Sequence, residues 1–261
     1  MDINKYAFVE EGVYLGKGVS IEPFAVVKKG AVLKDNVVIK SHAYVNGNVN
    51  IGENSTIWPG AVIGTKPQDL KYQGEKTYVK IGKNCDIREF ATINASCQES
   101  SVVEIGDDCL IMAYCHVAHN CKLGKRVVMA NSSMLAGHVE IEDFAIIGGM
   151  TPVHQFVRVG AYAMVGGFSR VVYDIPPYSI GGGDPFKFGG INIIGLQRNG
   201  FPLSIRNKLC QIFKITFRKN LTLEKALEKI EKEIEPIPEV KHWVDFCRNS
   251  KRGIMGINGK K

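Results

Sequence analysis

An aliphatic residue or methionine stands at every sixth position of this chain, in one phase from Val9 to Val171. Only Asp69, Glu75 and Glu99 break that phase. Neither the 3.6-residue period of a helix nor the alternation of a half-buried strand sustains such a register. Repeats this short bury their apolar face only by stacking on their neighbours. We therefore predict a mainly β fold, a parallel β-helix with eighteen residues per coil, whose handedness the period does not determine.

The cysteines follow the same repeat. Small apolar side chains suit a tightly packed interior. Four cysteines stand two residues before an aliphatic position, namely Cys85, Cys109, Cys115 and Cys121. We predict that these four pack in the core and are neither metal ligands nor members of disulfides.

The composition is that of a folded chain, with 45% hydrophobic and 23% charged residues. It contains no run of eighteen apolar residues, and the opening MDINKYAFVEEG carries neither a basic leader nor an apolar signal segment. We expect a cytoplasmic protein with no membrane-inserted segment.

The six-residue register stops after Val171, where DIPPYSIGGGDPFKFGG is dense in proline and glycine. Beyond it, INIIGLQRNG, PLSIRNKLCQIFKITFRKN, TLEKALEKIEKEI and PEVKHWVDFCRNS are typical of helices, and Thr222 suits the N-cap of the third. The sequence therefore predicts a β-helix domain over residues 1–185 and a C-terminal α-helical domain over residues 186–261.

The positive charge of the chain is confined to its C-terminal part. Residues 187–261 hold 16 Lys and Arg against 7 Asp and Glu, a net charge of +9, whereas residues 1–186 hold 17 against 19, a net charge of −2. This surface is either a solvated helix face or a dock for an acidic protein or for phosphates. No nucleic-acid-binding motif accompanies the charge, so we expect no nucleic-acid partner.

Two polar segments interrupt the repeat without shifting its phase. The first, GTKPQDLKYQGEKTYV, spans residues 64–79 and contains Asp69 and Lys71. The second, NASCQESSVVE, spans residues 94–104 and carries less distinctive chemistry. A loop inserted at a corner leaves the stack intact, and such loops on rigid scaffolds often hold function. We expect the first loop to be functional.

Three histidines are spaced along the sequence by close to one coil of eighteen residues. His119 and His138 are nineteen residues apart, and His138 and His154 are sixteen apart, so we expect all three near one corner of successive coils. His116 precedes His119 by three residues and should lie on the same coil, just before that corner. Gly137 follows His119 by eighteen residues, which should place its amide about 5 Å above the imidazole. This pair suits acyl transfer, because an imidazole can take a proton from a hydroxyl while the amide stabilises the oxyanion.

Zinc binding and a structural role are the competing interpretations of stacked histidines. Three ligands of one zinc each lie about 2.0 to 2.1 Å from the metal, but backbones two coils apart are separated by about 10 Å. His119 and His154 are therefore poorly placed for one metal, unless ligands are shared between subunits. We predict neither a metal nor another cofactor. His42 and His242 lie away from the predicted histidine cluster and are expected to be ordinary surface residues.

Hexapeptide repeats alone indicate only a broad transferase superfamily, but several segments together are more specific. They resemble the UDP-N-acetylglucosamine O-acyltransferase family, which starts lipid A synthesis, across nearly the whole chain. The matching segments are KSHAYVNG, QDLKYQGE, INASCQES, AYCHVAHNCKLG, LAGHVEIEDFAIIGGMTPVHQF, VGGFS, DIPPY and INIIGLQRNGF. The resemblance implies a left-handed parallel β-helix, a homotrimer with active sites between neighbouring subunits, and a helical cap.

The resemblance also implies a reaction and its residues. A 3-hydroxyacyl group would move from acyl carrier protein to the 3-hydroxyl of UDP-N-acetylglucosamine by direct attack on the thioester. His119 matches the general base, Gly137 the oxyanion amide, and Gly167 the place where a bulky side chain shortens the acyl groove, so glycine favours longer chains. The remaining matches are substrate contacts. Contacts to the sugar and its surroundings match Asp69, Lys71, His116 and His138. His154 and Gln155 match groups that line the nucleotide-sugar pocket, and Arg198 matches a contact to a phosphate.

Two positions depart from the family pattern. Asn120 follows the base, where relatives often have Asp, and Asn199 follows Arg198, where a second Arg is often found. They leave the acceptor open between UDP-N-acetylglucosamine and its 3-amino analogue, for which the product would be an amide. A hexapeptide-repeat acyltransferase that uses coenzyme A, a zinc hydratase and a non-catalytic scaffold also stay open as functions for this chain.

Overall fold

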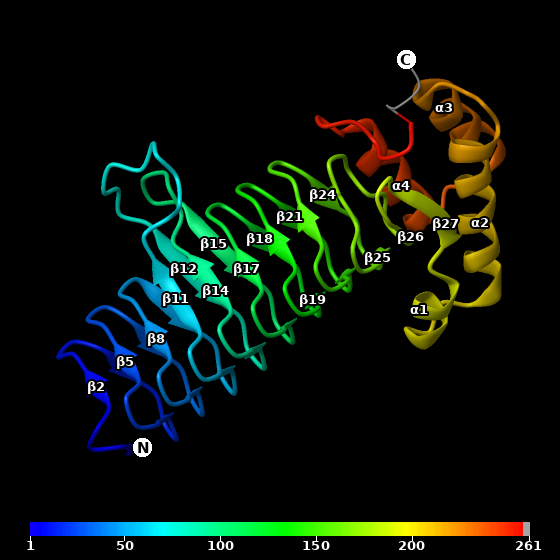
Figure 1. The fold of residues 1–261 in the computed structure, drawn as a ribbon. Helices are drawn as coiled ribbons and strands as arrows, with labels where there is room; N and C mark the ends of the chain where they lie inside the picture. The colour runs from blue at the N-terminus through cyan, green and yellow to red at the C-terminus, as the bar shows by residue number, and fades with distance from the viewer. Residues whose placement is uncertain (258–261) are drawn as a thin grey trace.

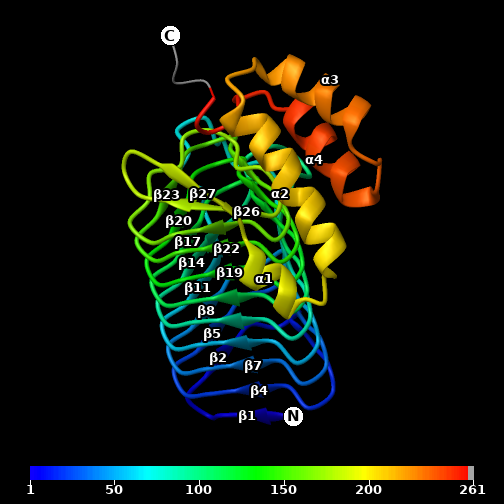
Figure 2. The same ribbon diagram turned by 90° about the vertical axis from the view of Figure 1, so that its right-hand side faces the viewer.

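The computed structural model describes residues 1–257 and consists of a three-sided column of short strands with helices packed at one end (Figure 1). The strands form three sheets of 11, 8 and 8 strands, here called sheets A, B and C. Up to β25, consecutive strands fall in successive sheets, so every third strand shares a sheet, and the coils stack one on another (Figure 2). The predicted parallel β-helix is confirmed.

The strands are mostly two residues long. Sheet A contains β1 (Asp2–Ile3), β4 (Ser20–Ile21), β7 (Val38–Ile39), β10 (Thr56–Ile57), β13 (Asp86–Ile87), β16 (Leu110–Ile111), β19 (Val128–Met129), β22 (Ile146–Ile147), β25 (Met164–Val165), β26 (Ser179–Gly182) and β27 (Lys187–Ile191). Sheet B contains β2 (Phe8–Val9), β5 (Val26–Val27), β8 (Tyr44–Val45), β11 (Val62–Thr65), β14 (Thr92–Asn94), β17 (His116–Val117), β20 (Met134–Leu135) and β23 (Pro152–Val153). Sheet C contains β3 (Tyr14–Leu15), β6 (Val32–Leu33), β9 (Val49–Ile51), β12 (Tyr78–Ile81), β15 (Val102–Ile105), β18 (Lys122–Leu123), β21 (Glu140–Ile141) and β24 (Arg158–Val159).

The register of the strands follows the six-residue repeat. In sheet A, Ile21 pairs with Ile39 and Ile39 with Ile57, each eighteen residues on. Ile57 then pairs with Ile87, and Ile87 with Ile111, because the two inserted loops lengthen these coils by multiples of six. These aliphatic side chains form a ladder through the column and are at most 1% exposed. The insertions therefore leave the core in phase.

The cysteines of the repeat are part of this core. The described residues contain no disulfide, and all of their cysteines are free. Burial raises the pKa of the Cys121 thiol to about 12, which keeps that side chain neutral. The predicted packing role is confirmed, because four of them are buried to 2% exposure or less, namely Cys85, Cys109, Cys115 and Cys121.

The last coil continues beyond the end of the six-residue register. Ile175 forms a bridge with Val159, and β26 pairs with β25 in parallel. Strand β27 then turns back and pairs antiparallel with β26. Residues 187–191, which the sequence grouped with the helical domain, therefore form the edge of sheet A.

Four helices follow β27. They are α1 (Ile193–Arg198), α2 (Leu203–Arg218), α3 (Leu223–Glu233) and α4 (Pro238–Arg248). The side chain of Thr222 accepts a hydrogen bond from the Lys225 N–H at 3.4 Å, so the predicted N-cap of α3 is confirmed. Trp243 and Phe246 on α4 are at most 2% exposed in a second apolar core.

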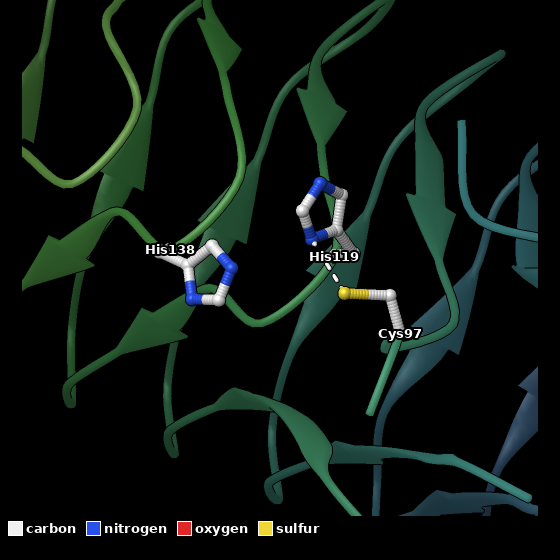
Figure 3. Close-up of side chains that lie close together, drawn as sticks. All are labelled: Cys97, His119 and His138. Atoms are coloured by element: carbon white, nitrogen blue, oxygen red, sulfur yellow. Dashed lines mark hydrogen bonds between the residues drawn. The ribbon is translucent and has the colours of Figure 1, made fainter. Parts of the chain in front are cut away.

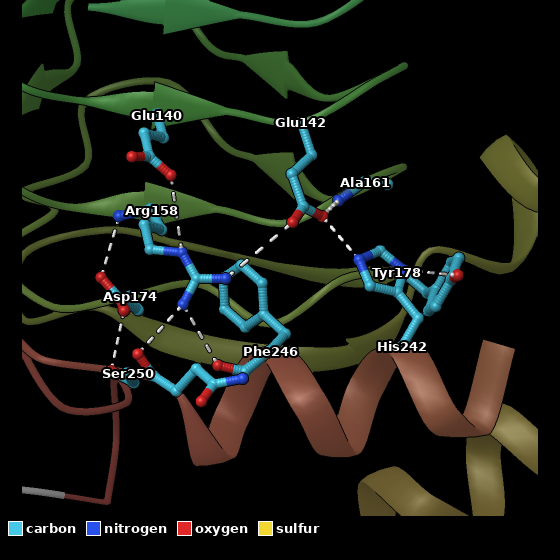
Figure 4. Close-up of polar contacts among 10 residues, drawn as sticks. Glu140, Glu142, Arg158, Ala161, Asp174, Tyr178, His242, Phe246 and Ser250 are labelled. Atoms are coloured by element: carbon cyan, nitrogen blue, oxygen red, sulfur yellow. Dashed lines mark hydrogen bonds and ion pairs between the residues drawn. The ribbon is translucent and has the colours of Figure 1, made fainter. Parts of the chain in front are cut away.

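Helix α4 is joined to the column by a bridge of polar side chains (Figure 4). Glu142 accepts the Ala161 N–H at 2.8 Å, and its carboxylate lies 2.8 Å from Nε2 of His242. Nδ1 of His242 lies 2.9 Å from the Tyr178 hydroxyl. The expectation that His242 is an ordinary surface residue is wrong, because this histidine connects the helices to the coils.

Arg158 makes a second connection to the same helix. Its guanidinium carbon lies 4.1 Å from the centre of the Phe246 ring, and Nη1 donates to the carbonyl oxygens of Phe246 and Asn249 at 3.3 and 3.4 Å. Asp174 accepts the Arg158 N–H at 2.8 Å and the Ser250 hydroxyl at 2.7 Å. Stacking and hydrogen bonding on one guanidinium favour arginine over lysine here.

Arg158→Ala is expected to lower the free energy of unfolding by about 1–3 kcal/mol, because it removes the ring contact with Phe246 and the hydrogen bonds to the carbonyls of Phe246 and Asn249, the first of which is part-buried. Urea titration followed by Trp243 fluorescence, in a Trp58→Phe background, measures this. Arg248→Ala is the matched control, because the Arg248–Glu231 pair is about half exposed and is worth roughly 0–1 kcal/mol. Equal losses in both variants would contradict the role of Arg158.

Within residues 1–257, no helix has both the length and the apolar character needed to cross a bilayer.

Candidate active site

The two inserted loops and the histidine cluster share one corner of the column, between sheets B and C. Residues 66–77 connect β11 to β12, and residues 95–101 connect β14 to β15 on the next coil. The turns after β17, β20 and β23 occupy the same corner on the following coils and carry His119, Gly137 and Gln155 in that order. We call this the B/C corner. Both loops project from the column beside these turns (Figure 1).

His119 is held through one ring nitrogen (Figure 3). Nδ1 lies 2.9 Å from Oδ1 of Asn120 and 3.3 Å from Sγ of Cys97, whose thiol donates to the same oxygen at 2.9 Å. An amide oxygen only accepts hydrogen bonds, so this contact favours the tautomer with the proton on Nδ1. Nε2 then keeps its lone pair, as a general base requires.

Asp69 faces that free nitrogen from the first loop. Its Oδ2 lies 3.8 Å from Nε2 of His119, and its Oδ1 accepts the Lys71 N–H at 2.9 Å. This backbone hydrogen bond, with the nearby His119, holds the pKa of Asp69 below its usual range, so the carboxylate is ionised. Although position 120 lacks the family's carboxylate, Asp69 supplies a negative charge beside the imidazole. Lys71 contributes its backbone, and its side chain is exposed.

Gly137 lies directly against the imidazole, as the eighteen-residue count predicts. A β-carbon added to Gly137 would lie 2.4 Å from Cε1 and 2.5 Å from Nε2 of His119, so no side chain fits there. Among the described residues, nothing accepts a hydrogen bond from the Gly137 N–H. The amide is therefore free for an oxyanion.

His116 and His138 both lie near His119. Nδ1 of His116 is 2.7 Å from the Thr92 hydroxyl, and the His138 ring meets that of His119 edge-on at a centroid distance of 5.3 Å. Burial, with the nearby His119, lowers the pKa of both His116 and His138. Both rings are therefore neutral near pH 7 and can exchange hydrogen bonds with a polar ligand.

The depressed pKa of His116 predicts a pH-dependent stability. The folded chain binds fewer protons at His116 than the unfolded chain, so this contribution is present above the unfolded pKa of 6.5 and is lost as the pH falls through the folded value. We expect His116→Asn to flatten the decrease in unfolding free energy between about pH 7 and about pH 5. Urea titrations across this range measure the slope, with the exposed His42→Asn as control. A slope unchanged by His116→Asn would contradict the assignment.

His154 does not join the ring cluster as expected. The ring stacked on His138 is Phe156, at 4.6 Å, because Phe156 follows His138 by one coil's length of eighteen residues. His154 stands two residues earlier and lines a neighbouring cavity of about 460 Å³ together with Met150 and Phe168. His154 therefore lies in the turn after β23 at the B/C corner, as expected, but its ring does not stack on that of His138.

Gln155 and Gly167 lie on the coils above the base. Gln155 is exposed at the B/C corner, and its backbone carbonyl oxygen lies 3.2 Å from Nδ1 of His154. Gly167 is also exposed, next to Phe168 of the cavity wall. A β-carbon at Gly167 would lie 3.2 Å from the Gly149 carbonyl oxygen, a close but not prohibitive contact.

Arg198 lies on a different face of the column. It lines a cavity of about 710 Å³ with Ile146, Met164 and Ile180, which belong to sheet A, and with Ile194 of α1. Sheet A is the side of the column opposite the B/C corner. One chain therefore does not bring Arg198 and His119 together.

Cys97 belongs to the site, although the sequence did not predict it there. The coil that contains the second loop is six residues longer than a regular eighteen-residue coil, so a residue above Cys97 should be sought twenty-four residues later. His119 follows by twenty-two, within the same two-residue tolerance that grouped the histidines. Counting with the inserted length would have found this contact.

A histidine with a free ring nitrogen beside an unpaired amide, at the corner of a hexapeptide β-helix, is typical of an acyltransferase of the hexapeptide-repeat class. Residues 30–65 and 103–137 match the family described as bacterial transferase hexapeptide. Residues 174–255 match the family described as UDP-N-acetylglucosamine O-acyltransferase, domain 2.

Similar proteins cover almost the whole chain. The acyl-[acyl-carrier-protein]–UDP-N-acetylglucosamine O-acyltransferase of Chlamydia caviae is 53% identical over 254 residues, which are 97% of this chain and 91% of that protein. The UDP-N-acetylglucosamine acyltransferase of Bacteroides fragilis superimposes with a TM-score of 0.94 at 40% identity, covering 96% of this chain and 98% of the other. That of Campylobacter jejuni gives 0.92 at 40% identity, covering 97% and 99%. The chain belongs to the UDP-N-acetylglucosamine O-acyltransferase family, and its fold is the left-handed parallel β-helix expected from that resemblance.

Proposed function

We propose that this chain transfers a 3-hydroxyacyl group from acyl carrier protein to the 3-hydroxyl of UDP-N-acetylglucosamine, the first step of lipid A synthesis. The observation that carries the proposal is the free Nε2 of His119 beside the unpaired amide of Gly137 and the carboxylate of Asp69. The donor and acceptor agree with the name of the Chlamydia caviae relative.

His119 acts as the general base in this reaction. Nε2 takes the proton of the sugar's 3-hydroxyl, and the oxygen attacks the thioester carbonyl. The N–H of Gly137 stabilises the resulting oxyanion. When the intermediate collapses, the carrier's thiolate leaves and takes the proton back from the imidazolium.

Direct attack is favoured over a covalent acyl-cysteine intermediate. Cys97 is the thiol next to the base, 3.3 Å from Nδ1 of His119. Burial and the nearby Asp69 raise the pKa of this thiol. A neutral thiol is a poor nucleophile, and its contact is with Nδ1 rather than with the basic Nε2.

The other residues of the corner bind substrate in this proposal. Asp69 and Lys71 contact the sugar and its surroundings, and the neutral rings of His116 and His138 supply further contacts. His154 and Gln155 line the nucleotide-sugar pocket.

We propose a homotrimer in which each active site combines two subunits. Arg198 binds a phosphate of the nucleotide, yet it lies on the face of its own chain opposite His119. A second copy with its sheet A side against the B/C corner brings the two residues to one substrate. Exposed apolar side chains at Met150, Ile193 and Ile194, each at least 45% exposed, are suited to such an interface.

Mixing two inactive variants tests the shared site. His119→Ala and Arg198→Ala are each expected to be impaired, but when co-expressed they should recover about one quarter of the parent rate, because random assembly completes that fraction of interfaces. His119→Ala mixed with the double variant cannot rebuild a site and is the control. No recovery from trimers that contain both single variants would contradict a site shared between subunits.

The acyl donor is expected to dock on the basic helices. Acyl carrier proteins are acidic, and a positive surface accelerates their encounter. The net charge of +9 over residues 187–261 fits this role. We place the reaction in the cytoplasm, where acyl carrier protein and the nucleotide sugar are available.

Mass spectrometry of the products tests the reaction, donor and chain length together. The purified protein is offered UDP-N-acetylglucosamine with a ladder of 3-hydroxyacyl carrier proteins. We expect an ester of a longer acyl chain, since Gly167 leaves the groove open. Equal turnover with acyl coenzyme A, amide formation only on the 3-amino sugar, or no turnover with any donor would each overturn the proposal.

A further inference from the structure

Three side chains at the B/C corner form a cluster in which Cys97 has no role in the acyl-transfer steps. The ligand atoms of Cys97, His119 and His138 all lie within 4.8 Å of one another (Figure 3). Cys97 comes from the second loop, and the two histidines come from the turns on the next two coils. All three are half-buried. A ligand of small size could therefore reach the three atoms from solvent.

The spacing is close to that of a tetrahedral metal site. Zinc–sulfur bonds of about 2.3 Å and zinc–nitrogen bonds of about 2.0–2.1 Å place ligand sulfur and nitrogen about 3.6 Å apart. Sγ of Cys97 is already 3.3 Å from Nδ1 of His119. The remaining separations are at most 4.8 Å, so rotation of the Cys97 and His138 side chains has to shorten them by up to about 1.5 Å to reach tetrahedral spacing.

The donor set also matches the metal. One thiolate and two imidazoles suit a borderline-soft divalent cation such as Zn²⁺ and do not suit Mg²⁺ or Ca²⁺, which prefer oxygen. His119 and His154, two coils apart, are poorly placed for one zinc ion. Cys97 replaces His154 as the third ligand here, so that separation does not affect this cluster. A fourth position remains for water.

We propose that Cys97, His119 and His138 bind Zn²⁺, and that the bound metal inhibits acyl transfer by occupying the base. The inhibition rests on the proposed function of His119, whereas the binding does not. Coordination of Nδ1 displaces its hydrogen bond to Asn120 and leaves the single proton of the neutral imidazole on Nε2. That nitrogen can then no longer accept a proton from the sugar. The Cys97 thiol releases its proton to solvent as the sulfur–metal bond forms.

Cobalt(II) titration of the purified full-length protein tests the binding without reference to activity. We expect about one equivalent of Co²⁺ to produce a near-ultraviolet thiolate-to-metal charge-transfer band together with visible bands typical of tetrahedral cobalt. Zn²⁺ should abolish these bands by displacement. Cys97→Ser should remove the charge-transfer band, and His138→Asn should weaken binding. Cys210→Ser, which changes a half-buried thiol on α2, is the matched control and should leave the spectrum unchanged.

The outcomes separate the two parts of the proposal. No charge-transfer band in the parent protein, or the same band in Cys97→Ser, overturns the metal site. Zn²⁺ should inhibit the parent reversibly, with recovery on chelation, and should inhibit Cys97→Ser much less relative to that variant's own metal-free rate. If the cobalt bands appear but Zn²⁺ does not inhibit the parent, the inhibitory role is overturned and the metal site itself is retained. An active His119→Ala protein overturns the proposed base itself, whatever the metal does.

Discussion

His119→Ala should lose nearly all turnover, by a factor of about 10²–10⁴, while the protein keeps its fold. The substitution removes a nitrogen at the B/C corner that is both free to accept a proton and adjacent to the Gly137 amide. Steady-state rates with acyl carrier protein and UDP-N-acetylglucosamine measure the loss. Circular dichroism and the urea midpoint show whether the variant is folded.

The control for this variant is a histidine at another place in the column. His42 is exposed and stacks on Phe24 at a centroid distance of 5.2 Å. His42→Ala should therefore keep turnover close to that of the parent. Turnover of His119→Ala within tenfold of the parent would sink the general-base assignment.

Gly137→Ala should reduce turnover by about 10²-fold, because it displaces the base by a distance of the order of 1 Å. The added methyl would lie 2.4 Å from Cε1 of His119, too close for either group to stay in place. The backbone of Gly137 is not in the left-handed region, so alanine itself causes no backbone strain. The alanine also retains the N–H, so the variant tests the position of the imidazole and not the presence of the amide.

Gly189→Ala is the matched control for this substitution. A β-carbon at Gly189 in β27 would lie 3.7 Å from its nearest neighbour, an ordinary contact. Turnover in that variant should be unchanged. If Gly137→Ala also turned over at the parent rate, the close packing of His119 against Gly137 would have no part in catalysis.

The repeat predicts those parts of the site that lie on regular coils. Gly137 follows His119 by one coil, and the structure places it against the imidazole as expected. The same count is less reliable for residues displaced from that register. His154 lies two residues before Phe156 in the same turn, so Phe156 stacks on His138 while His154 lines a neighbouring cavity.

The contact of Asp69 with His119 could not be predicted in this way. Asp69 reaches His119 from the longer inserted loop, and the path of such a loop depends on what it packs against rather than on the coil. The bridge from Glu142 to His242 is similar, because residues a hundred apart meet only where α4 docks on the column. Hydrophobic periodicity contains no information on either contact.

The sequence by itself determined the β-helix, the phase of its core and the vertical pairing of a histidine with a glycine amide, because a six-residue period acts locally and resumes in the same phase after each inserted loop. Only the tertiary structure decided which side chains surround that histidine and that Arg198 lies on the opposite face. Those relations depend on how two loops and four helices pack against the finished column, and such packing is a property of the whole chain.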